Sequence, residues 1–209
     1  MKLFANIISV VLHPLLMCTY GSLIFFFLLK GSPYDIMLTL KFKLIITAMI
    51  FSFSFMLPVV NIFILYKLKR IHSFTLQDQN ERTFPYIMTS CFYFGLFYLF
   101  LDIQIPLLKT FIFGAGLSIL FTALINFRYK ISAHTVGIGG LLASLILITY
   151  AMRYDAVILI SGLFVLSGLV ATCRLYLNRH FPKQVYAGFF LGMGTQILVY
   201  IIFLTLKLI

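Results

Sequence analysis

The sequence predicts an all-α protein, a polytopic bundle of about six or seven membrane-spanning helices. Of its 209 residues, 62% are hydrophobic and only 10% are charged, and the mean hydropathy is +1.09. A soluble domain carries about 25% charged and about 45–50% apolar residues, so this chain lacks the polar surface that would keep a monomer dissolved. At roughly 20 apolar residues per span, the length leaves no room for a separate aqueous domain.

Two spans are expected in the first third of the chain. The first apolar run, 3–29, is too long for the core of a signal peptide, so we expect a retained helix there. A short loop, 30–43, follows it. The second span is expected at 44–66, where Pro58 predicts a kink of the kind that membrane helices tolerate.

The most polar stretch, 67–85, separates these helices from the rest of the chain. Further spans are expected at 86–101, 107–127, 131–150, 156–177 and 185–206. Tyrosines fall at the expected span ends, as interface aromatics do: Tyr66, Tyr86, Tyr129, Tyr150, Tyr154 and Tyr186.

The charge is strongly positive, with 16 Lys and Arg against five Asp and Glu. In a soluble protein this would suggest nucleic acid, but here the cations flank apolar runs. They therefore indicate lipid head groups or an anionic substrate, phosphate first, and no nucleic-acid partner.

Seven spans would place the N-terminus and the loops after spans two, four and six on one face. That face carries ten of the 16 basic residues, which favours the cytoplasm. The count becomes even if four of the ten bind substrate instead, namely Arg82, Lys130, Arg174 and Arg179, so the charges leave the orientation open. A bacterial inner membrane is the expected location, and the sequence says nothing of an oligomer.

The three cysteines, Cys18, Cys91 and Cys173, lie in or beside apolar segments. No two of them have the spacing of a metal knuckle or a redox pair. We therefore expect no disulfide framework, no metal site and no cofactor.

Two of the four histidines, His134 and His180, fall on the shared face, each just before a glycine-rich helix. Small residues let helix backbones approach closely, and these are Gly137, Gly139 and Gly140 after the first histidine and Gly188, Gly192 and Gly194 after the second. Two tightly packed helices would thus hold two imidazoles. His13, inside the first span, is interpreted as structural because that span offers it no ionisable partner.

The segments around these histidines resemble two motifs of the type 2 phosphatidic acid phosphatase superfamily, which are membrane lipid phosphatases. Its third motif is Ser-Arg, five residues, His, three residues, Asp, and Arg174 and His180 keep that spacing. Its second motif, Pro-Ser-Gly-His, corresponds to Ile131-Ser132-Ala133-His134. The resemblance covers roughly the last 130 residues and implies a catalytic-type core over 67–209, preceded by N-terminal transmembrane helices over 1–66.

Three positions depart from the family pattern. Gln184 stands in place of the Asp of the third motif, and Cys173 stands in place of its Ser. The first motif, Lys, six residues, Arg-Pro, survives only as Arg82-Thr83-Phe84-Pro85, with Thr75 in the place of the lysine.

The resemblance implies a role for each candidate residue. His180 would be the nucleophile that forms a phosphohistidine, and His134 the general acid for the leaving alkoxide. Arg174 offers a planar fork for phosphate oxygens. Lys130 and the Ser132 hydroxyl would complete the phosphate cradle, and either Lys130 or Arg82 would supply the charge of the missing lysine.

Gln184 would orient the His180 ring without supplying the charge of a carboxylate. A charge-assisted hydrogen bond contributes about 1.5–3 kcal/mol, which is about ten- to a hundredfold in rate. The expected activity is hydrolysis of a lipid phosphate or lipid diphosphate without a metal. The alternatives are a phosphotransferase that passes the phosphoryl group to a lipid or sugar hydroxyl, and a non-catalytic phospholipid-binding protein on the same scaffold.

Overall fold

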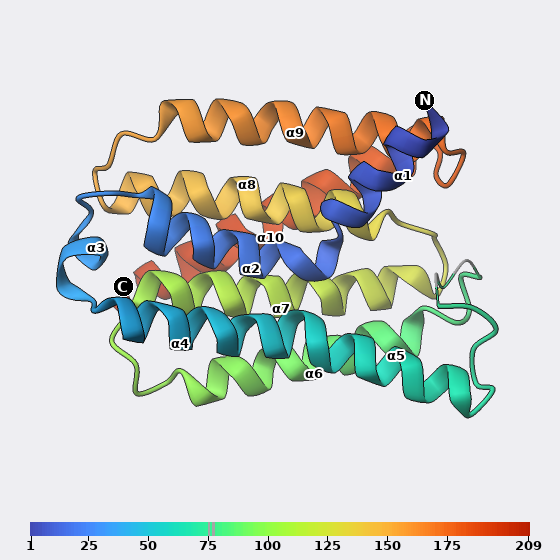
Figure 1. The fold of residues 1–209 in the computed structure, drawn as a ribbon, viewed down its shortest axis with the longest axis horizontal. Coiled ribbons are helices and arrows are strands. Elements are labelled where there is room, and N and C mark those ends of the chain that lie inside the picture. Colours follow the sequence, from blue (N-terminus) through green and yellow to red (C-terminus); the bar gives the residue numbers. More distant parts are fainter. Residues whose placement is uncertain (75, 77) are drawn as a thin grey trace.

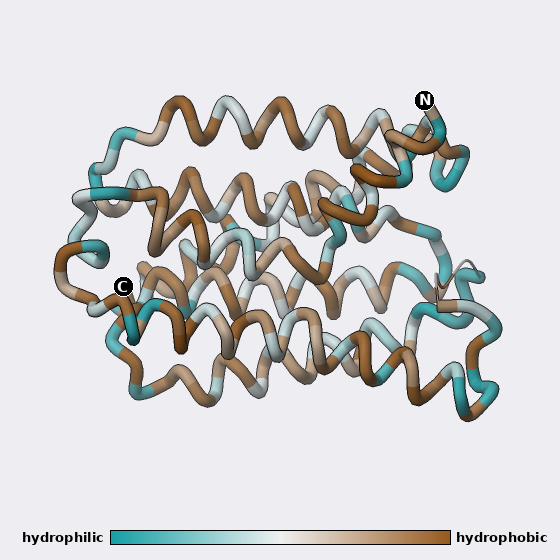
Figure 2. The backbone as a smooth tube through the Cα atoms, in the orientation of Figure 1, coloured by the Kyte–Doolittle hydropathy of each residue, from teal (hydrophilic) through white to brown (hydrophobic). Residues whose placement is uncertain are grey.

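The protein is a bundle of roughly parallel helices in a computed structural model that describes residues 1–74, 76 and 78–209 (Figure 1). No strand occurs in these residues. Six helical segments are long and apolar enough to cross a membrane: Lys2–Leu28, Leu40–Lys67, Pro106–Asn126, Ala133–Ala151, Val157–Tyr176 and Pro182–Thr205. Apolar residues run along these helices, and hydrophilic ones gather at the two ends of the bundle (Figure 2). The chain is therefore an integral membrane protein.

The first expected span contains a break that the hydropathy pattern does not show. Helix α1 (Lys2–Val11) is followed by a 3-10 turn (Pro14–Leu16), by α2 (Met17–Leu23) and by a π turn (Ile24–Leu28). Pro14 has no N–H to continue the ladder and disfavours helical geometry in the residue before it. Helix α1 therefore ends at Val11, and His13 adopts an extended conformation.

The second span is continuous but contains an irregular turn near its proline. It comprises α4 (Leu40–Phe51), a π turn (Ser52–Met56) and α5 (Leu57–Lys67). Pro58 stands in the first turn of α5, directly after the π turn, where its missing N–H disturbs the regular ladder. The irregularity at the expected position is therefore a π turn.

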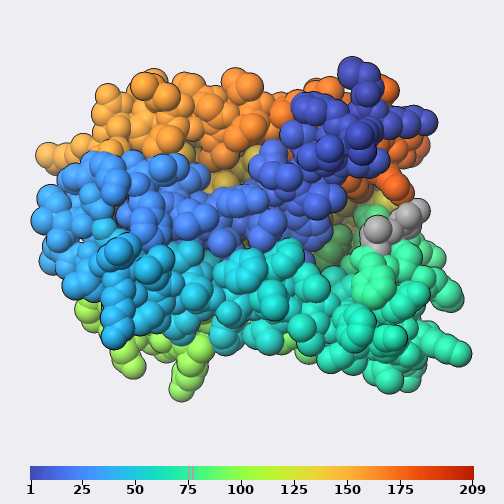
Figure 3. Space-filling model, viewed as in Figure 1, coloured from blue at the N-terminus to red at the C-terminus, as the bar shows by residue number. Residues whose placement is uncertain are grey.

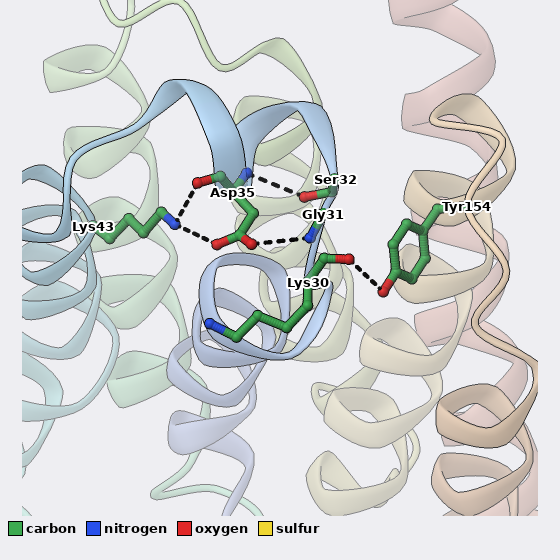
Figure 4. A network of polar contacts seen from close by, with 6 residues as sticks. All are labelled: Lys30, Gly31, Ser32, Asp35, Lys43 and Tyr154. Atoms are coloured by element: carbon green, nitrogen blue, oxygen red, sulfur yellow. Dashed lines mark hydrogen bonds and ion pairs between the residues drawn. The ribbon is translucent and has the colours of Figure 1, made fainter.

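The loop before α4 is shorter than expected, because α4 begins at Leu40 and a short helix, α3 (Pro33–Met37), occupies the connection. Lys43 therefore lies on α4, where its ammonium is 2.6 Å from the Asp35 carboxylate and also donates to the Asp35 carbonyl. The ammonium of Lys43 holds the pKa of Asp35 below its usual range. Figure 4 shows this network and the Tyr154 hydroxyl, which donates to the Lys30 carbonyl at 3.0 Å.

The remaining helices are α6 (Thr83–Leu99), α7 (Pro106–Asn126), α8 (Ala133–Ala151), α9 (Val157–Tyr176) and α10 (Pro182–Thr205). Helix α6 lies alongside the other helices in Figure 1, but its 17 residues are fewer than the roughly 20 of a typical span. It is about 26 Å long at the α-helical rise.

The chain alternates direction through these segments, so its connections gather at two ends of the bundle (Figure 1). The N-terminus, the loop after α5 and the turns after α7 and α9 lie together at one end, which we call the site end. Helix α3, the turns after α6 and α8, and the C-terminus lie at the other. This grouping agrees with the shared face predicted from seven alternating spans.

One apolar core joins the early and the late helices. Phe26 and Ile50 from the N-terminal segments are fully buried in the same cluster as Leu108 and Ile138. Figure 3 shows that residues before 67 form the central part of one face of the molecule, next to the later residues drawn in orange.

Helices α8 and α10 pack against each other through glycines. A Cβ added at Gly192 would lie 2.1 Å from the Val136 carbonyl oxygen, and one at Gly139 would lie 2.4 Å from the Phe189 carbonyl oxygen. Gly188 faces Thr135 and Ser132 in the same way. Gly137 instead faces Pro14 and Met17, and Gly194 has no neighbour within 4 Å. The predicted close approach of the two helices is therefore confirmed at Gly139, Gly188 and Gly192, and the Gly140 nitrogen would also lie 2.8 Å from a Cβ at Gly192.

Candidate functional site

A cavity of about 550 Å³ opens at the site end, within the size range of small-molecule sites. Five predicted residues line it together: Arg82, Lys130, His134, Arg174 and His180. They come from the loop before α6, the turn before α8, the first turn of α8, the last turn of α9 and the turn before α10. Segments far apart in the sequence thus converge on one cavity.

The turn between α9 and α10 presents Arg174 and His180. Helix α9 ends with Asn178 in the left-handed region (φ 53°), and the Arg179 N–H donates back to the Arg174 carbonyl at 3.2 Å. This is the hydrogen-bonding pattern that closes a helix with a left-handed residue. His180 lies directly before the N-cap of α10, with Pro182 as the first helical residue.

Gln184 fixes the tautomer of His180. Its side-chain oxygen accepts the Phe181 N–H at 3.1 Å and lies 3.2 Å from Nδ1 of His180. Because this oxygen is an acceptor for the backbone N–H, Nδ1 of His180 is the donor of the second bond. A neutral His180 therefore keeps its lone pair on Nε2, as a nucleophile at that atom would require.

The His180 ring is held in its neutral form. Burial, together with the positive charge of Arg174, lowers its pKa from 6.5 to about 4. The hydrogen bond to Gln184 acts in the opposite direction and is outweighed. His180 is therefore uncharged across the physiological pH range.

The His134 ring is held from the other side of the cavity. Its Nε2 lies 3.0 Å from the Ser9 carbonyl oxygen, which can only accept, so Nε2 carries the proton. The lone pair of neutral His134 is then on Nδ1. The His13 ring lies edge-on to the His134 ring, with 5.6 Å between centroids.

The cavity is strongly cationic. Arg82, Lys130, Arg174 and Arg179 line it, and no carboxylate does so among the described residues. Partial burial, with the charges of Arg82, Arg179 and Arg174, lowers the pKa of Lys130, while Asp78 acts in the opposite direction. Such a concentration of like charge in a low-dielectric site favours binding of an anion.

Arg174 provides the most specific sign of an anion site. One of its terminal nitrogens donates to the Ser9 hydroxyl at a long 3.4 Å. Its Nε is buried and has no hydrogen-bond partner among the residues that the structure describes. A buried donor of this kind requires an explanation such as a bound ion.

The loop that carries Arg82 is attached to the end of α7. The Asn126 amide donates to the Gln79 carbonyl at 2.7 Å, and the Gln79 amide donates to the Asn126 carbonyl at 2.6 Å. Arg82 is buried, and its Nε donates to the Leu76 carbonyl. The loop is therefore fixed so that Arg82 lines the cavity.

Two predicted residues do not line the cavity. The Ser132 side chain is fully buried elsewhere, and its hydroxyl has no partner in the described part of the chain. Its backbone N–H donates instead to the Gln184 carbonyl at 3.3 Å, which ties the two motif segments together. Gln184 does not line the cavity but contacts Nδ1 of His180. Thr75 lies outside the described residues.

The two acidic residues nearest these motifs are also placed away from the cavity wall. Glu81 accepts from the backbone and ring of His72, and Asp78 accepts the Asn80 N–H at 3.0 Å. Neither carboxylate contacts His180 through a hydrogen bond in the described structure.

Sequence reasoning missed the contribution of the N-terminal segment. His13, interpreted as structural, lines the cavity, and so do Ser9 and Asn6. The signal was the dipeptide His13-Pro14 inside an apolar span, because irregular backbone at membrane depth is tolerated where it lines a cavity or is buried in protein. Tyr86, one turn after Arg82, was expected at an interface but also lines the cavity.

Neither a scan against protein-family models nor searches of curated proteins and of solved structures gives a match to this chain. The described residues also contain no group of three or more His, Cys, Asp or Glu side chains that could hold a metal ion. The cavity itself combines two histidines with fixed tautomers, four cationic side chains and an otherwise largely apolar lining.

Proposed function

We propose that the chain is a membrane phosphatase that hydrolyses a lipid phosphate or lipid diphosphate through a phosphohistidine. The observation that carries this proposal is the convergence of His134, Arg174 and His180 on one cavity, where the Arg174 Nε is buried and has no hydrogen-bond partner among the described residues. The resemblance of the two motif segments to the type 2 phosphatidic acid phosphatase superfamily supports the same reaction.

In the first step, Nε2 of His180 attacks phosphorus in line with the leaving oxygen, and the bond from phosphorus to that oxygen breaks. Neutral His134 accepts at Nδ1 the proton carried by a singly ionised phosphate ester and passes it to the leaving alkoxide, since its Nε2 proton is bound to Ser9. In the second step, neutral His134 takes a proton from water, which attacks phosphorus and releases inorganic phosphate from His180. His134 then passes this proton to the released phosphate, and both histidines return to their neutral starting states.

The cations stabilise the charge on the phosphoryl oxygens. Arg174 can bind two oxygens through its fork, while Arg82 and Lys130 supply the positive charge that the family's first-motif lysine would bring. The proposed reaction needs no metal, because charge neutralisation comes from these side chains.

The proposed substrate is amphiphilic because of how the cavity is lined. Charged groups lie at the site end, and apolar residues line the rest, among them Met17, Phe111 and Leu141. A phosphorylated head group would bind the cations while its acyl or prenyl chain remained among apolar side chains. Helical spans are typical of a bacterial cytoplasmic membrane, whereas outer-membrane proteins are β-barrels, so the inner membrane is the proposed location.

A second candidate function is a non-catalytic phospholipid-binding protein. The observation that favours it is Gln184, which orients His180 but leaves the ring without an anionic partner. The two candidates share phosphate binding and differ in turnover.

The test is phosphate transfer to His180. Purified full-length chain would be incubated with lipid phosphate labelled with ³²P on the phosphoryl group and then quenched in alkali, where phosphohistidine survives. We expect label on the wild-type chain and on His72→Asn, the matched control outside the cavity, and none on His180→Asn. Release of label to water supports a phosphatase, and transfer to an added hydroxyl acceptor supports a phosphotransferase. Tight binding without any label on the protein would contradict the phosphatase and favour the non-catalytic candidate.

A further inference from the structure

The end of α1 creates a free backbone acceptor next to the site. The carbonyls in the last turn of a helix lack intrahelical partners, and Pro14 prevents this helix from continuing. The Ser9 carbonyl would otherwise accept the N–H of His13, but His13 is extended. The Ser9 carbonyl instead accepts a hydrogen bond from the Nε2–H of His134. The Val11 carbonyl accepts one from the Tyr20 hydroxyl at 2.7 Å.

The same residue reaches a second functional group. The Ser9 hydroxyl accepts from a terminal nitrogen of Arg174 at 3.4 Å, although Ser9 and Arg174 are far apart in sequence. Ser9 is 9% exposed, so both contacts are shielded from solvent. One residue therefore contacts the candidate acid and the candidate phosphate ligand.

His13 stabilises the interruption between α1 and the 3-10 turn. Its Nδ1 accepts the Leu15 N–H at 3.3 Å and so caps the 3-10 turn that follows, while its ring packs edge-on to His134. The cap favours the extended conformation that keeps the His13 N–H away from Ser9. His13 and Pro14 thus keep the Ser9 carbonyl available to His134.

We propose that Ser9, freed by the helix end at Pro14, is a positioning residue that sets the tautomer of His134 and orients Arg174. The inference rests on the proposed function for its catalytic meaning. In that mechanism, the bond to Ser9 decides that His134 exchanges protons with the substrate at Nδ1. The N-terminal helix α1 is then part of the site, because its residues Asn6 and Ser9 line the cavity.

The tautomer is measured without turnover. In full-length chain labelled with ¹⁵N-histidine and ¹³C-carbonyl serine in lipid bilayers, solid-state NMR reports which imidazole nitrogen carries the proton. We expect wild-type His134 to be the Nε2–H tautomer, with its Nε2 dipolar-coupled to the Ser9 carbonyl carbon. A wild-type His134 in the Nδ1–H tautomer, or without that coupling, overturns the proposal whether or not any variant folds.

Two substitutions test the cause. Pro14→Ala allows α1 to continue, so the His13 N–H competes for the Ser9 carbonyl and the coupling to His134 is reduced or lost. Pro33→Ala, at the first helical position of α3 at the other end of the bundle, is the matched control and should leave His134 unchanged. Retention of the full coupling in a folded Pro14→Ala chain contradicts the role of the helix end.

The contact to Arg174 is measured by binding of inorganic phosphate to the full-length chain. Ser9→Ala removes the hydroxyl and keeps the carbonyl, so we expect affinity to fall about twofold to tenfold, the value of one hydrogen bond, with the His134 tautomer unchanged. Ser22→Ala is the control, because Ser22 is buried outside the cavity and its hydroxyl donates to the Thr19 carbonyl. Equal phosphate affinity for Ser9→Ala and wild type overturns the role toward Arg174.

Failure of this inference is distinguishable from failure of the proposed function. If the chain hydrolyses no lipid phosphate, but His134 is the Nε2–H tautomer and Pro14→Ala and Ser9→Ala have their expected effects, the result contradicts the phosphatase and supports Ser9 as a positioning residue. If the wild type, Pro14→Ala and Ser9→Ala all hydrolyse lipid phosphate at the same rate, the result supports the phosphatase and contradicts the positioning role of Ser9.

Discussion

At the scale of single residues, the neutral Gln184 side chain limits the reactivity of His180. Gln184→Glu keeps the oxygen near Nδ1 of His180 and adds a negative charge. We expect phosphate release to rise about ten- to a hundredfold, the value of a charge-assisted bond, and the acid limb of the pH profile to move to higher pH as the His180 pKa rises. Gln184→Asp, the residue of the family motif, should act in the same direction. Hydrolysis that stays at background in both variants would favour the non-catalytic candidate.

His180 should also make the stability of the chain depend on pH. Its pKa falls from 6.5 to about 4 on folding, so between these values the unfolded chain binds a proton that the folded chain does not. Stability therefore decreases as pH falls through this window. Thermal unfolding in detergent at pH 7, 5.5 and 4.5 should show this decrease, and His180→Asn should reduce it.

His72 provides a control with the opposite sign. The Glu81 carboxylate raises the pKa of His72, so its contribution to stability is present at low pH and is lost as pH rises. Replacing His72 with Asn should therefore steepen the acid-side decrease. Equal slopes for wild type and His180→Asn would show that His180 titrates normally in the folded chain.

At the scale of secondary-structure elements, the glycine contact between α8 and α10 sets the distance between the two motif segments. Gly192→Val would place a Cβ 2.1 Å from the Val136 carbonyl oxygen, so the helices must separate. We expect a lower unfolding temperature and weaker phosphate binding, because His134 lies in the first turn of α8 and His180 lies directly before α10.

Gly194 lies on the same helix but faces open space. Gly194→Val is therefore the matched control, and we expect near wild-type unfolding and phosphate affinity. If Gly192→Val binds phosphate as tightly as Gly194→Val, the close packing of α8 and α10 is not needed for the site.

At the scale of the whole molecule, the alternation of seven segments places the site end on one side of the membrane. We expect cysteines introduced at Lys69 and Asn178 to react with an impermeant maleimide from the same side, and one at Asp155 from the other. Asp102 at the end of α6 tests whether this short helix crosses. The native cysteines, of which Cys91 is exposed, would first be replaced. Labelling of Lys69→Cys and Asp102→Cys from the same side would mean that α6 does not cross.

Much of this architecture could be predicted from the sequence. Apolar runs of nearly 20 residues or more have few stable alternatives in a bilayer, and Arg174 and His180, which were selected by their spacing, line one cavity. The contact of the His13 ring with His134 was not predicted, because only partners within its own span were considered, whereas His134 comes from α8. The burial of Ser132 depends on how α8 meets α10, which single-sequence patterns do not specify.

Helix α9 has one further consequence. Only Leu163, Ser167, Val170 and Cys173 along its length are buried, so most of its surface faces the hydrocarbon. A helix in that position tilts when its length and the bilayer thickness differ, and α9 carries Arg174 and leads directly to His180. The rate of the proposed hydrolysis should therefore depend on the acyl chain length of the surrounding lipid. In nanodiscs whose bilayers differ in thickness, phosphate affinity should pass through an optimum. A rate and an affinity that do not change with thickness would mean that the tilt of α9 does not affect the turn that follows it.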